Sequence, residues 1–333
     1  MKRIYSFDGQ LYVVTGVHKV LMDIHNAIKD SFDAKVLGTL EYEELNPDLH
    51  IKREEYRKIG SIFSLRNSIL IVHQRRLAVK YRLLSLIPFL NLKVVYVHHN
   101  ILTGQRRTTL LPKRIITISD RCIENLTEYF GVPRKRITKI YNTVIDKKEG
   151  EHSRSNDGIT RILYTAKIFP IKRQIQLVEN IKEKLNSNIQ IIFAGDGEDL
   201  EQLKKITEND SRFKCLGFTS NIAQELAKAD YCMLFSEKEG LPISLIEATM
   251  MGVPIICNNV GGNLEIAKDG YNAFICDDWD KLIEVLNHLS EISGAEYERM
   301  SKNSREHYER YFNYEMFKIK YTEYLKRLQN EKY

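Results

Sequence analysis

Short apolar runs alternate with amphipathic stretches along the whole chain. The first run covers residues 1–7, and a helical pattern of apolar residues extends from Gly16 to Ile28. Because strand-like runs are followed by helix-like ones, the pattern predicts an α/β fold with doubly wound parallel sheets. The runs that we expect to form strands are 1–7, 34–40, 68–72, 94–97 and 115–119 in the first half and 162–166, 189–194, 231–235 and 253–257 in the second.

The length of the chain and one polar segment predict two domains. At 333 residues the chain exceeds the usual size of a single hydrophobic core. A polar run from Lys147 to Gly158 interrupts the pattern and, on composition alone, predicts a linker. We therefore expect a first domain at 1–146, a linker at 147–158, a second domain at 159–310 and a closing helix at 311–333.

The composition is that of an ordinary globular protein. Hydrophobic residues make up 43% of the chain and charged residues 28%, both usual for globular domains. We find no run of about 18 apolar residues that could span a membrane, and the segment 1–8 lacks the apolar core of a signal peptide. The cysteines are scattered and odd in number, which indicates buried thiols in a reducing cytoplasm: Cys122, Cys215, Cys232, Cys257 and Cys276.

The charge is distributed unevenly along the chain. Residues 1–146 carry a net charge of +10, whereas the remainder carries −4. Between Tyr56 and Ser119 there are 12 basic residues and no acidic one. Such a one-sided field predicts an anionic partner. In the stretch 75–90 the basic residues accompany leucines, which is the pattern of a helix lying on an anionic membrane, and the alternative is a core helix with solvated charges. The basic residues of that stretch are Arg75, Arg76, Lys80 and Arg82.

The most informative stretch, residues 235–262, reads FSEKEGLPISLIEATMMGVPIICNNVGG. It predicts a loop, a helix that begins at Pro242 and ends at Gly252, and then a buried strand. The start of a helix attracts phosphate because its N–H groups are unpaired and its dipole end is positive. Glu239 would lie before such an anion and Glu247 beside it. Two carboxylates flanking a phosphate suit a ligand with hydroxyls on both sides, such as a sugar nucleotide.

The same stretch resembles the E-x7-E signature of the large retaining glycosyltransferase family GT4, which has the GT-B fold. The resemblance implies two Rossmann-like domains facing across a cleft, the first on the acceptor side and the second binding the nucleotide sugar. It also implies that the segment 311–333 crosses back to the first domain. By this resemblance Glu239 contacts hydroxyls of the donor sugar, and Glu247 holds the ribose diol.

One position departs from the family pattern. Many members have glycine where this chain has Pro242, and proline has no N–H group to donate to a phosphate. The neighbouring amides, those of Leu241 and Ile243, would then make that contact, with Gly240 preceding them.

The first half carries two weaker matches. Gly16 stands where the family has a glycine-rich loop facing donor and acceptor, and a plain helix start is the alternative. His98 follows a predicted strand, at the place where many relatives have a histidine near the donor sugar and the acceptor; His99 is the alternate. A packed or solvated imidazole is the other interpretation. Because adjacent residues of a strand face opposite sides, we expect only one of the two histidines to point inward.

The second half carries the expected phosphate-binding cations. The resemblance implies that Lys167, where the family has arginine, and Lys172 clamp the diphosphate, and Arg173 is either a third contact or solvated. Phe218 follows a strand end near the nucleobase. The implied donor-binding residues are therefore Gly16, Lys167, Lys172, Gly240, Leu241, Pro242, Ile243 and Glu247, with His99, Arg173 and Phe218 as further candidates.

We expect no metal site and no cofactor. The segment Asp278-Trp279-Asp280 looks like the Asp-x-Asp motif that holds a metal in other glycosyltransferases. It stands directly before an apolar helical run at 282–289, so helix capping is the preferred interpretation. The leaving group would be stabilised by Lys167, Lys172 and the helix start instead.

Together these features predict an enzyme of the hexosyltransferase type. It would move a hexose-type sugar from a nucleoside-diphosphate sugar, with a UDP-sugar as the expected donor, to a glycan or lipid-linked acceptor in bacterial cell-surface polysaccharide synthesis. The family implies retention through a front-face mechanism, in which the departing phosphate oxygen takes the acceptor's proton. The alternatives are a GT-B sugar-nucleotide epimerase and a non-catalytic carbohydrate- or nucleotide-binding protein. We expect no nucleic-acid partner, and a cytoplasmic protein that is peripheral on the inner face of the plasma membrane.

Overall fold

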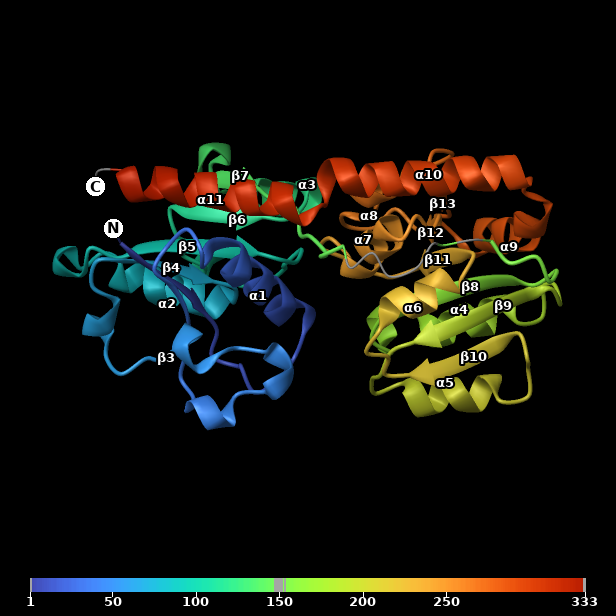
Figure 1. Ribbon diagram of the computed structural model, residues 1–333, viewed down its shortest axis with the longest axis horizontal. Coiled ribbons are helices and arrows are strands. Elements are labelled where there is room, and N and C mark those ends of the chain that lie inside the picture. The colour runs from blue at the N-terminus through green and yellow to red at the C-terminus, as the bar shows by residue number, and fades with distance from the viewer. Residues whose placement is uncertain (1, 147–151, 153, 332–333) are drawn as a thin grey trace. The chain divides into compact units, whose positions relative to one another are not determined.

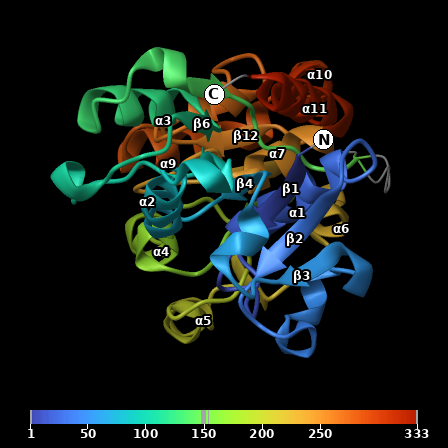
Figure 2. The same ribbon diagram turned by 90° about the vertical axis from the view of Figure 1, so that its left-hand side faces the viewer.

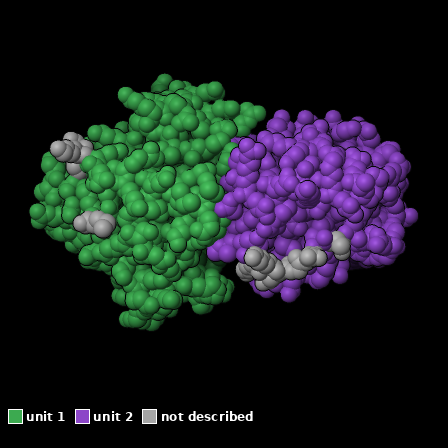
Figure 3. All heavy atoms as spheres, turned by 45° about the horizontal axis from the view of Figure 1, so that its top comes forward, with its two compact units in different colours: residues 1–143, 314–333 green, residues 144–313 purple. Residues whose placement is uncertain are grey.

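The computed structural model describes residues 2–146, 152 and 154–331. It divides into two compact units, which Figure 3 shows in different colours. The first unit consists of residues 1–143 and 314–333, and the second of residues 144–313. Half of the expected linker at 147–158 lies outside the described residues. The last helix of the chain therefore belongs to the first unit (Figure 1).

The first unit contains a seven-stranded parallel sheet with the strand order β3-β2-β1-β4-β5-β6-β7. Its strands are β1 (Arg3–Phe7), β2 (Ala34–Gly38), β3 (Tyr56–Lys58), β4 (Ser68–Val72), β5 (Lys93–His98), β6 (Arg114–Thr117) and β7 (Ile137–Lys139). Its helices are α1 (Gly16–Ile28), α2 (Arg75–Leu84), α3 (Asp120–Glu124) and α11 (Tyr314–Asn330).

Helices cover both faces of this sheet, which explains why its central strands β4 and β5 are buried along their whole length. Neighbouring residues of β2 show the two faces. Val36 clusters with Leu21 of α1, whereas Leu37 belongs to the core cluster that contains Ala78 and Tyr81 of α2. Figure 2 shows α1 over β1 and β2, and α2 beside β4.

The end of α11 is fixed to the first sheet by a buried lysine. Lys93, the first residue of β5, is almost inaccessible to solvent. Its Nζ donates to the carbonyl oxygens of Leu328 at 2.6 Å and Glu331 at 2.7 Å. The carbonyl groups at a helix end form the negative pole of its dipole, so they are suitable partners for a buried ammonium group.

The second unit contains a six-stranded parallel sheet with the order β10-β9-β8-β11-β12-β13. Its strands are β8 (Thr160–Thr165), β9 (Ile189–Ala194), β10 (Phe213–Gly217), β11 (Tyr231–Leu234), β12 (Ile255–Cys257) and β13 (Ala273–Ile275). Its helices are α4 (Gln174–Ile181), α5 (Leu200–Thr207), α6 (Ile222–Ala227), α7 (Ile243–Met250), α8 (Asn263–Ile266), α9 (Trp279–His288) and α10 (Gly294–Tyr311). Two parallel sheets of this kind confirm the predicted α/β class.

The structure differs from the predicted elements at several positions. The helix expected to begin at Pro242 begins one residue later, because Pro242 has an extended ψ of 122° and is the N-cap of α7. The amphipathic stretch 75–90 is helical only to Leu84, and Pro88 opens a separate 3₁₀ turn. The short strands β7 and β13 were not predicted, and neither was the edge strand β3. It has three residues and only half-buried or exposed side chains, so it lacks the apolar run of a central strand.

Helix α10 supports α7 from its carboxyl end. Arg305 Nη1 donates to the Met250 carbonyl oxygen at 2.6 Å, and Ser304 Oγ donates to the Val253 carbonyl oxygen at 3.0 Å. An arginine bonded to the last carbonyls of a helix satisfies groups that have no partner within the helix. The position of α7, and with it the stretch singled out in the sequence, therefore depends on α10.

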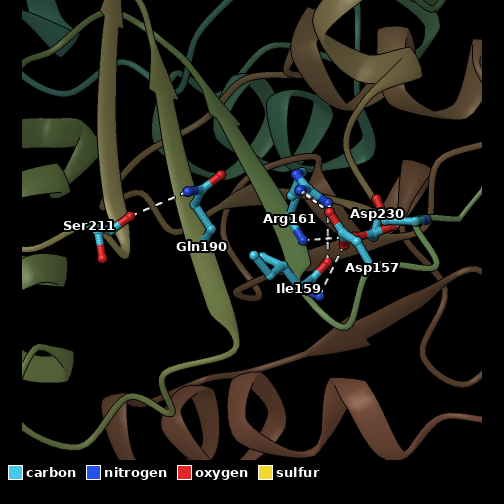
Figure 4. A network of polar contacts seen from close by, with 7 residues as sticks. Asp157, Ile159, Arg161, Gln190, Ser211 and Asp230 are labelled. Atoms are coloured by element: carbon cyan, nitrogen blue, oxygen red, sulfur yellow. Dashed lines mark hydrogen bonds and ion pairs between the residues drawn. The ribbon is translucent and has the colours of Figure 1, made fainter.

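A buried carboxylate organises the amino ends of the second sheet (Figure 4). Asp230 accepts hydrogen bonds from the backbone N–H groups of Ser155 and Arg161, both at 2.7 Å. The Arg161 guanidinium reaches Asp157 with Nη1 at 3.0 Å, and Gln190 donates to the Ser211 carbonyl oxygen at 3.3 Å. These contacts satisfy backbone groups where the strands begin, so the opposite, carboxyl edge remains for ligands.

The structure also describes the cysteines and the apolar character of the helices. All five thiols are free, as predicted; four are buried and Cys215 is half-buried. Within the described part of the chain, none of the helices combines the length and the apolar character that crossing a membrane requires.

Two loops at the carboxyl edge of the second sheet approach each other too closely for any side chain. A Cβ atom on Gly195 would lie 1.9 Å from the Ala166 carbonyl oxygen, and one on Gly197 would lie 2.2 Å from the Ile168 carbonyl oxygen. The Ile168 N–H also donates to the Asp196 carbonyl oxygen at 3.0 Å. The turn after β9 therefore supports the loop after β8, and glycine is required there.

This contact predicts a large cost for Gly195→Ala. The added methyl group would push against backbone atoms that cannot rotate away, so we expect the second unit to lose about 1–3 kcal/mol of stability. Differential scanning calorimetry of the full chain measures the change as a lower unfolding midpoint.

The matched control is Gly294→Ala, at the first residue of α10, where a Cβ atom would meet nothing within 4 Å. We expect that variant to stay within about 0.5 kcal/mol of the parent. Equal midpoints for the two variants would contradict the proposed close approach.

Candidate active site

Three loops of the second unit are joined at the carboxyl edge of its sheet. They follow β8, β11 and β12, which are neighbours in the strand order. The Glu237 N–H donates to the Ile171 carbonyl oxygen, and the Gly262 N–H donates to the Gly240 carbonyl oxygen, both at 2.9 Å. Asn258 Nδ2 donates to the Ser236 carbonyl oxygen at 2.7 Å. Backbone bonds thus connect each loop to the next, at the edge where parallel sheets bind ligands.

An ion pair lies at the centre of these loops. Lys172 Nζ lies 2.5 Å from Glu239 Oε1, and the Glu239 side chain is only 8% exposed. The Tyr164 hydroxyl accepts from the Phe235 N–H at 3.0 Å and donates to the Lys172 carbonyl oxygen. Burial raises the pKa of Tyr164, so its proton stays in place for that second bond. Lys172 has three N–H donors, and Glu239 uses one of them.

A second close approach determines the path of the backbone at Glu239. Gly261 has a φ of 56°, and a Cβ atom there would lie 2.0 Å from the Glu239 carbonyl oxygen. Only glycine combines that left-handed conformation with that contact. Glycine is therefore required at Gly261, near the end of the stretch 235–262 that the sequence analysis singled out.

The start of α7 lies directly after this ion pair in the chain. Residues 239–242 are buried, and Ile243 and Ser244 at the helix start are half-buried. The N–H groups of the first turn of a helix point out of its start without partners inside the helix. Glu247 is half-buried, one turn into α7. Donors from the helix start and two carboxylates thus belong to one continuous segment.

The other expected cations are arranged differently from Lys172. Lys167 is exposed, with its Nζ 5.8 Å from the centre of the Phe169 ring. Arg173 turns away towards Glu237, with 3.4 Å between Nε and Oε1, and towards Trp279. The structure therefore brings Lys172 into contact with Glu239, whereas Arg173 pairs with Glu237 instead. Phe218, the candidate near the nucleobase, is 79% exposed.

The two adjacent histidines of the first unit have different neighbours. His98 ends β5, and its Nδ1 lies 3.1 Å from the Tyr96 hydroxyl. His99 Nε2 lies 2.9 Å from His73 Nδ1, and the two rings are stacked. The expectation that only one of them points inward was wrong, because both imidazoles are buried. A sheet with helices on both faces has two interiors, so both sides of the strand are inside.

Sequence reasoning missed most of a buried cluster around His99. Asp8, His18 and His73 lie there with almost no exposed surface. Asp8 Oδ1 accepts from Gln74 Nε2 at 2.8 Å and lies 3.6 Å from His18 Nε2. The signal was present, because Asp8 directly follows β1 and His73 directly follows β4, just as His99 follows β5. Residues that follow parallel strands meet at one edge.

Burial keeps His73, His98 and His99 neutral. It lowers the pKa of His98 to about 4 and that of His99 to about 3, and it lowers the pKa of His73 well below its usual value. The neighbouring histidines lower the pKa of His73 and His99 further. Among the described residues, His73 Nε2 and His98 Nε2 are buried without a hydrogen-bond partner. Such atoms are costly unless a ligand or water satisfies them.

The structure also places Gly16 and the segment that contains Asp278 and Asp280. Gly16 begins α1 and is exposed, and a Cβ atom there would meet nothing within 4 Å, so the fold itself does not require glycine.

Asp278 is the N-cap of α9 and accepts from the Lys281 N–H at 2.7 Å, which confirms the capping interpretation. Asp280 lies 3.7 Å from Lys184. No group of three or more His, Cys, Asp or Glu side chains that could hold a metal occurs among the described residues.

The chain has relatives among known proteins. Residues 146–307 match the family model of "Glycosyl transferases group 1". The chain is 27% identical to N-acetyl-alpha-D-glucosaminyl L-malate synthase of Bacillus anthracis, over 49% of this chain and 46% of that protein. It is 28% identical to UDP-Gal:alpha-D-GlcNAc-diphosphoundecaprenol alpha-1,3-galactosyltransferase of Escherichia coli, over 42% and 38% of the two chains. The chain thus aligns with less than half the length of these two relatives.

The fold has close counterparts among solved structures. Alr3699/HepE of Anabaena in complex with UDP superposes with a TM-score of 0.83 over 98% of this chain and all of that one, at 17% identity. At that identity the likeness concerns the fold alone, and it covers both units. The whole chain therefore has the GT-B fold, and nearly all of its second unit matches the glycosyl transferases group 1 family.

Proposed function

We propose that this protein is a retaining glycosyltransferase. It moves a hexose-type sugar from a nucleoside-diphosphate sugar, with UDP as the nucleotide, to a glycan or lipid-linked acceptor in bacterial cell-surface polysaccharide synthesis. The family match and relatives such as the E. coli galactosyltransferase support the reaction class. The HepE complex with UDP supports the choice of nucleotide.

The observation that carries this proposal is the Lys172–Glu239 pair in front of α7. A sugar nucleotide needs a cation for its diphosphate and acceptors for the sugar hydroxyls on either side. Lys172 supplies an ammonium group with N–H donors beyond the one that Glu239 uses, and the start of α7 supplies N–H groups. Glu239 takes the sugar side and Glu247 the ribose side. Lys167 adds a second cation.

The proposal also gives a role to residues of the first unit. His98 and His99, with Gly16 at the start of α1, stand at the carboxyl edge of its sheet. Their neutral imidazoles donate and accept hydrogen bonds without adding charge, which suits sugar hydroxyls.

The stereochemistry of the anomeric carbon is retained when the acceptor oxygen bonds to that carbon on the same face from which the diphosphate leaves. The departing phosphate oxygen takes the acceptor's proton, so no carboxylate base is required.

The carboxylates should separate sugar transfer from nucleotide binding. Glu239→Ala should abolish transfer while the dissociation constant for UDP stays equal or falls, because Lys172 loses its competing partner. Glu247→Ala should weaken UDP binding, since one hydrogen bond from the ribose to a charged group is worth roughly 1.5–3 kcal/mol. Titration calorimetry measures the binding, and release of UDP from a UDP-sugar measures the turnover.

Glu284→Ala is the matched control, because Glu284 is an exposed helix carboxylate of the same unit that pairs with Lys281. It should bind UDP and turn over like the parent. If the Glu239 and Glu247 variants behave like this control, the donor site lies elsewhere. A new sugar epimer formed from the donor alone would favour the epimerase alternative.

We further propose that transfer needs no metal ion and no cofactor. Lys167, Lys172 and the start of α7 meet the charge of the diphosphate, as a metal does in other transferases.

Activity should therefore survive strong chelation. The rate of UDP release in the presence of excess EDTA should equal the untreated rate. Complete loss in EDTA, followed by recovery with added Mg²⁺ or Mn²⁺, would contradict the proposal and direct attention to Asp278 and Asp280.

The end of α2 and the segment that follows it support a peripheral position on an anionic membrane. Leu83, Leu86 and Phe89 are each more than half exposed, and the Phe89 ring stacks on the exposed Phe63 at 5.9 Å. Exposed apolar side chains that lie among basic ones bind lipid surfaces. The neighbouring cations Arg76 and Lys80 are exposed, and Arg82 is half-buried. Arg75 is bonded to the Gly104 carbonyl oxygen instead.

This surface predicts salt-dependent membrane binding. The protein should co-sediment with anionic vesicles at low salt and be released at high salt, because each basic residue near the surface contributes about 1 kcal/mol. The triple variant Arg76→Gln, Lys80→Gln and Arg82→Gln should lose most of this binding and keep its affinity for UDP.

The control for this experiment removes three exposed lysines elsewhere: Lys52→Gln, Lys205→Gln and Lys214→Gln. It should sediment like the parent. Absence of the parent protein from the vesicle pellet at low salt would exclude the membrane proposal and favour a soluble acceptor.

A further inference from the structure

A strongly basic cavity of about 320 Å³ lies within the first unit, and none of the candidate active-site residues lines it. It is formed where β6 and β7 begin, beside the end of α11. Among the described residues that line it, the only carboxylate is Glu331. The cations that line it are Lys113, Arg114, Lys135, Arg136 and Arg327.

Two of these cations are held rigidly by other groups. Arg136 Nη2 donates to the carbonyl oxygens of Leu111, at 2.8 Å, and Pro112. Arg114 forms a fork on Glu331, with Nε at 3.0 Å and Nη2 at 2.5 Å from Oε2. The wall of the cavity is therefore preorganised, which reduces the entropy that a ligand must overcome.

Among the described residues, no group holds the other three cations in this way. Lys113, Lys135 and Arg327 are exposed at the mouth of the cavity. Since Glu331 compensates one of the five cations, the cavity retains a net charge of four. A single carboxylate ligand would leave most of that charge unpaired.

Two lysines near the cavity, Lys2 and Lys93, have pKa values lowered by burial and by neighbouring cations. Burial, followed by Lys93 and Arg114, lowers the pKa of Lys2 to about 8. Burial and Arg114 also lower the pKa of Lys93. Both lysines stand at the amino ends of their strands, on the same edge of the sheet as the cavity. An anion bound there would relieve this repulsion.

The cavity is separate from the candidate active site of the first unit. All strands of the sheet are parallel, and the cavity lies where β6 and β7 begin, whereas His98 and His99 lie where β5 ends. A six-residue strand spans roughly 17–20 Å. A ligand of the cavity therefore does not belong to the donor or to the reacting acceptor hydroxyl.

We propose that this cavity is a binding site for a phosphate-bearing anion, either a phosphomonoester or a diphosphate. Arginine forks match the geometry of phosphate oxygens, and the lysines at the mouth add charge without fixed direction. The ligand is a soluble phosphorylated compound or the headgroup of a phosphorylated lipid, and both sources present the same chemistry to these side chains.

Protection of individual lysines from an amine-acylating reagent tests the site in the full chain. Inorganic pyrophosphate, added without metal, should protect Lys113 and Lys135 at low ionic strength and leave Lys52 and Lys205 reactive, as read by mass spectrometry of peptides. The same experiment reads Lys172 separately, so pyrophosphate at the donor site does not obscure the result. This outcome does not depend on the proposed transferase activity.

Charge removal provides the second measurement. The variant Lys113→Gln, Lys135→Gln and Arg327→Gln should lose pyrophosphate affinity about tenfold or more at this site, which is followed by hydrogen exchange of the peptides around β7. The control variant Lys52→Gln, Lys205→Gln and Lys214→Gln carries the same net charge and should stay within about twofold of the parent. Arg114 and Arg136 are left unchanged because they hold the fold together.

Vesicles distinguish the two sources. Protection of Lys113 and Lys135 by phosphatidylcholine vesicles containing phosphatidic acid, at phosphate concentrations where pyrophosphate has no effect, would identify a lipid headgroup. Protection by pyrophosphate and not by these vesicles would identify a soluble ligand. The proposal is overturned if neither probe protects the two lysines, or if the triple variant and the control variant bind equally.

Discussion

The ion pair between Lys172 and Glu239 is the interaction on which the candidate donor site depends. The two side chains come from loops that follow different strands, and the carboxylate is almost inaccessible to solvent. A buried carboxylate is tolerated only with a cation and hydrogen-bond donors nearby. The loops after β8 and β11 therefore cannot separate without leaving a charge unpaired. The ion pair that stabilises the loops also presents the two groups that a sugar nucleotide requires.

Backbone sterics make this arrangement rigid. Gly195 supports the loop after β8, and Gly261 supports Glu239 itself, each at a distance that excludes a Cβ atom. Hydrogen bonds between backbone groups connect the same loops, so the ammonium and carboxylate positions are set before any ligand arrives. Charged groups that need not reorganise during a reaction stabilise a transition state more effectively than mobile ones. The glycines of this region thus serve the geometry of the site rather than flexibility.

Much of this architecture could be predicted from the sequence, because buried parallel strands are apolar runs and helix ends have recognisable residues. The strands β4 and β9 match the predicted runs, and Asp278 caps α9 as expected. The sequence could not show that Lys172 pairs with Glu239, 67 residues away, because that contact depends on β8 lying beside β11. The His73–His99 contact likewise depends on β4 lying beside β5. Strand order is a long-range property, and single polar residues after strands do not reveal it.

The basic half of the chain is not the half that contains the proposed diphosphate site. The proposed diphosphate site lies in the part of the chain with net charge −4, and it relies on a few positioned groups. The excess positive charge of residues 1–146 is displayed instead around α2 and at the amino ends of β6 and β7. At the carboxyl edge of the same sheet, burial keeps the histidines neutral. The net charge of the first unit therefore concerns surfaces beyond the reaction itself, and local geometry determines the chemistry of the donor.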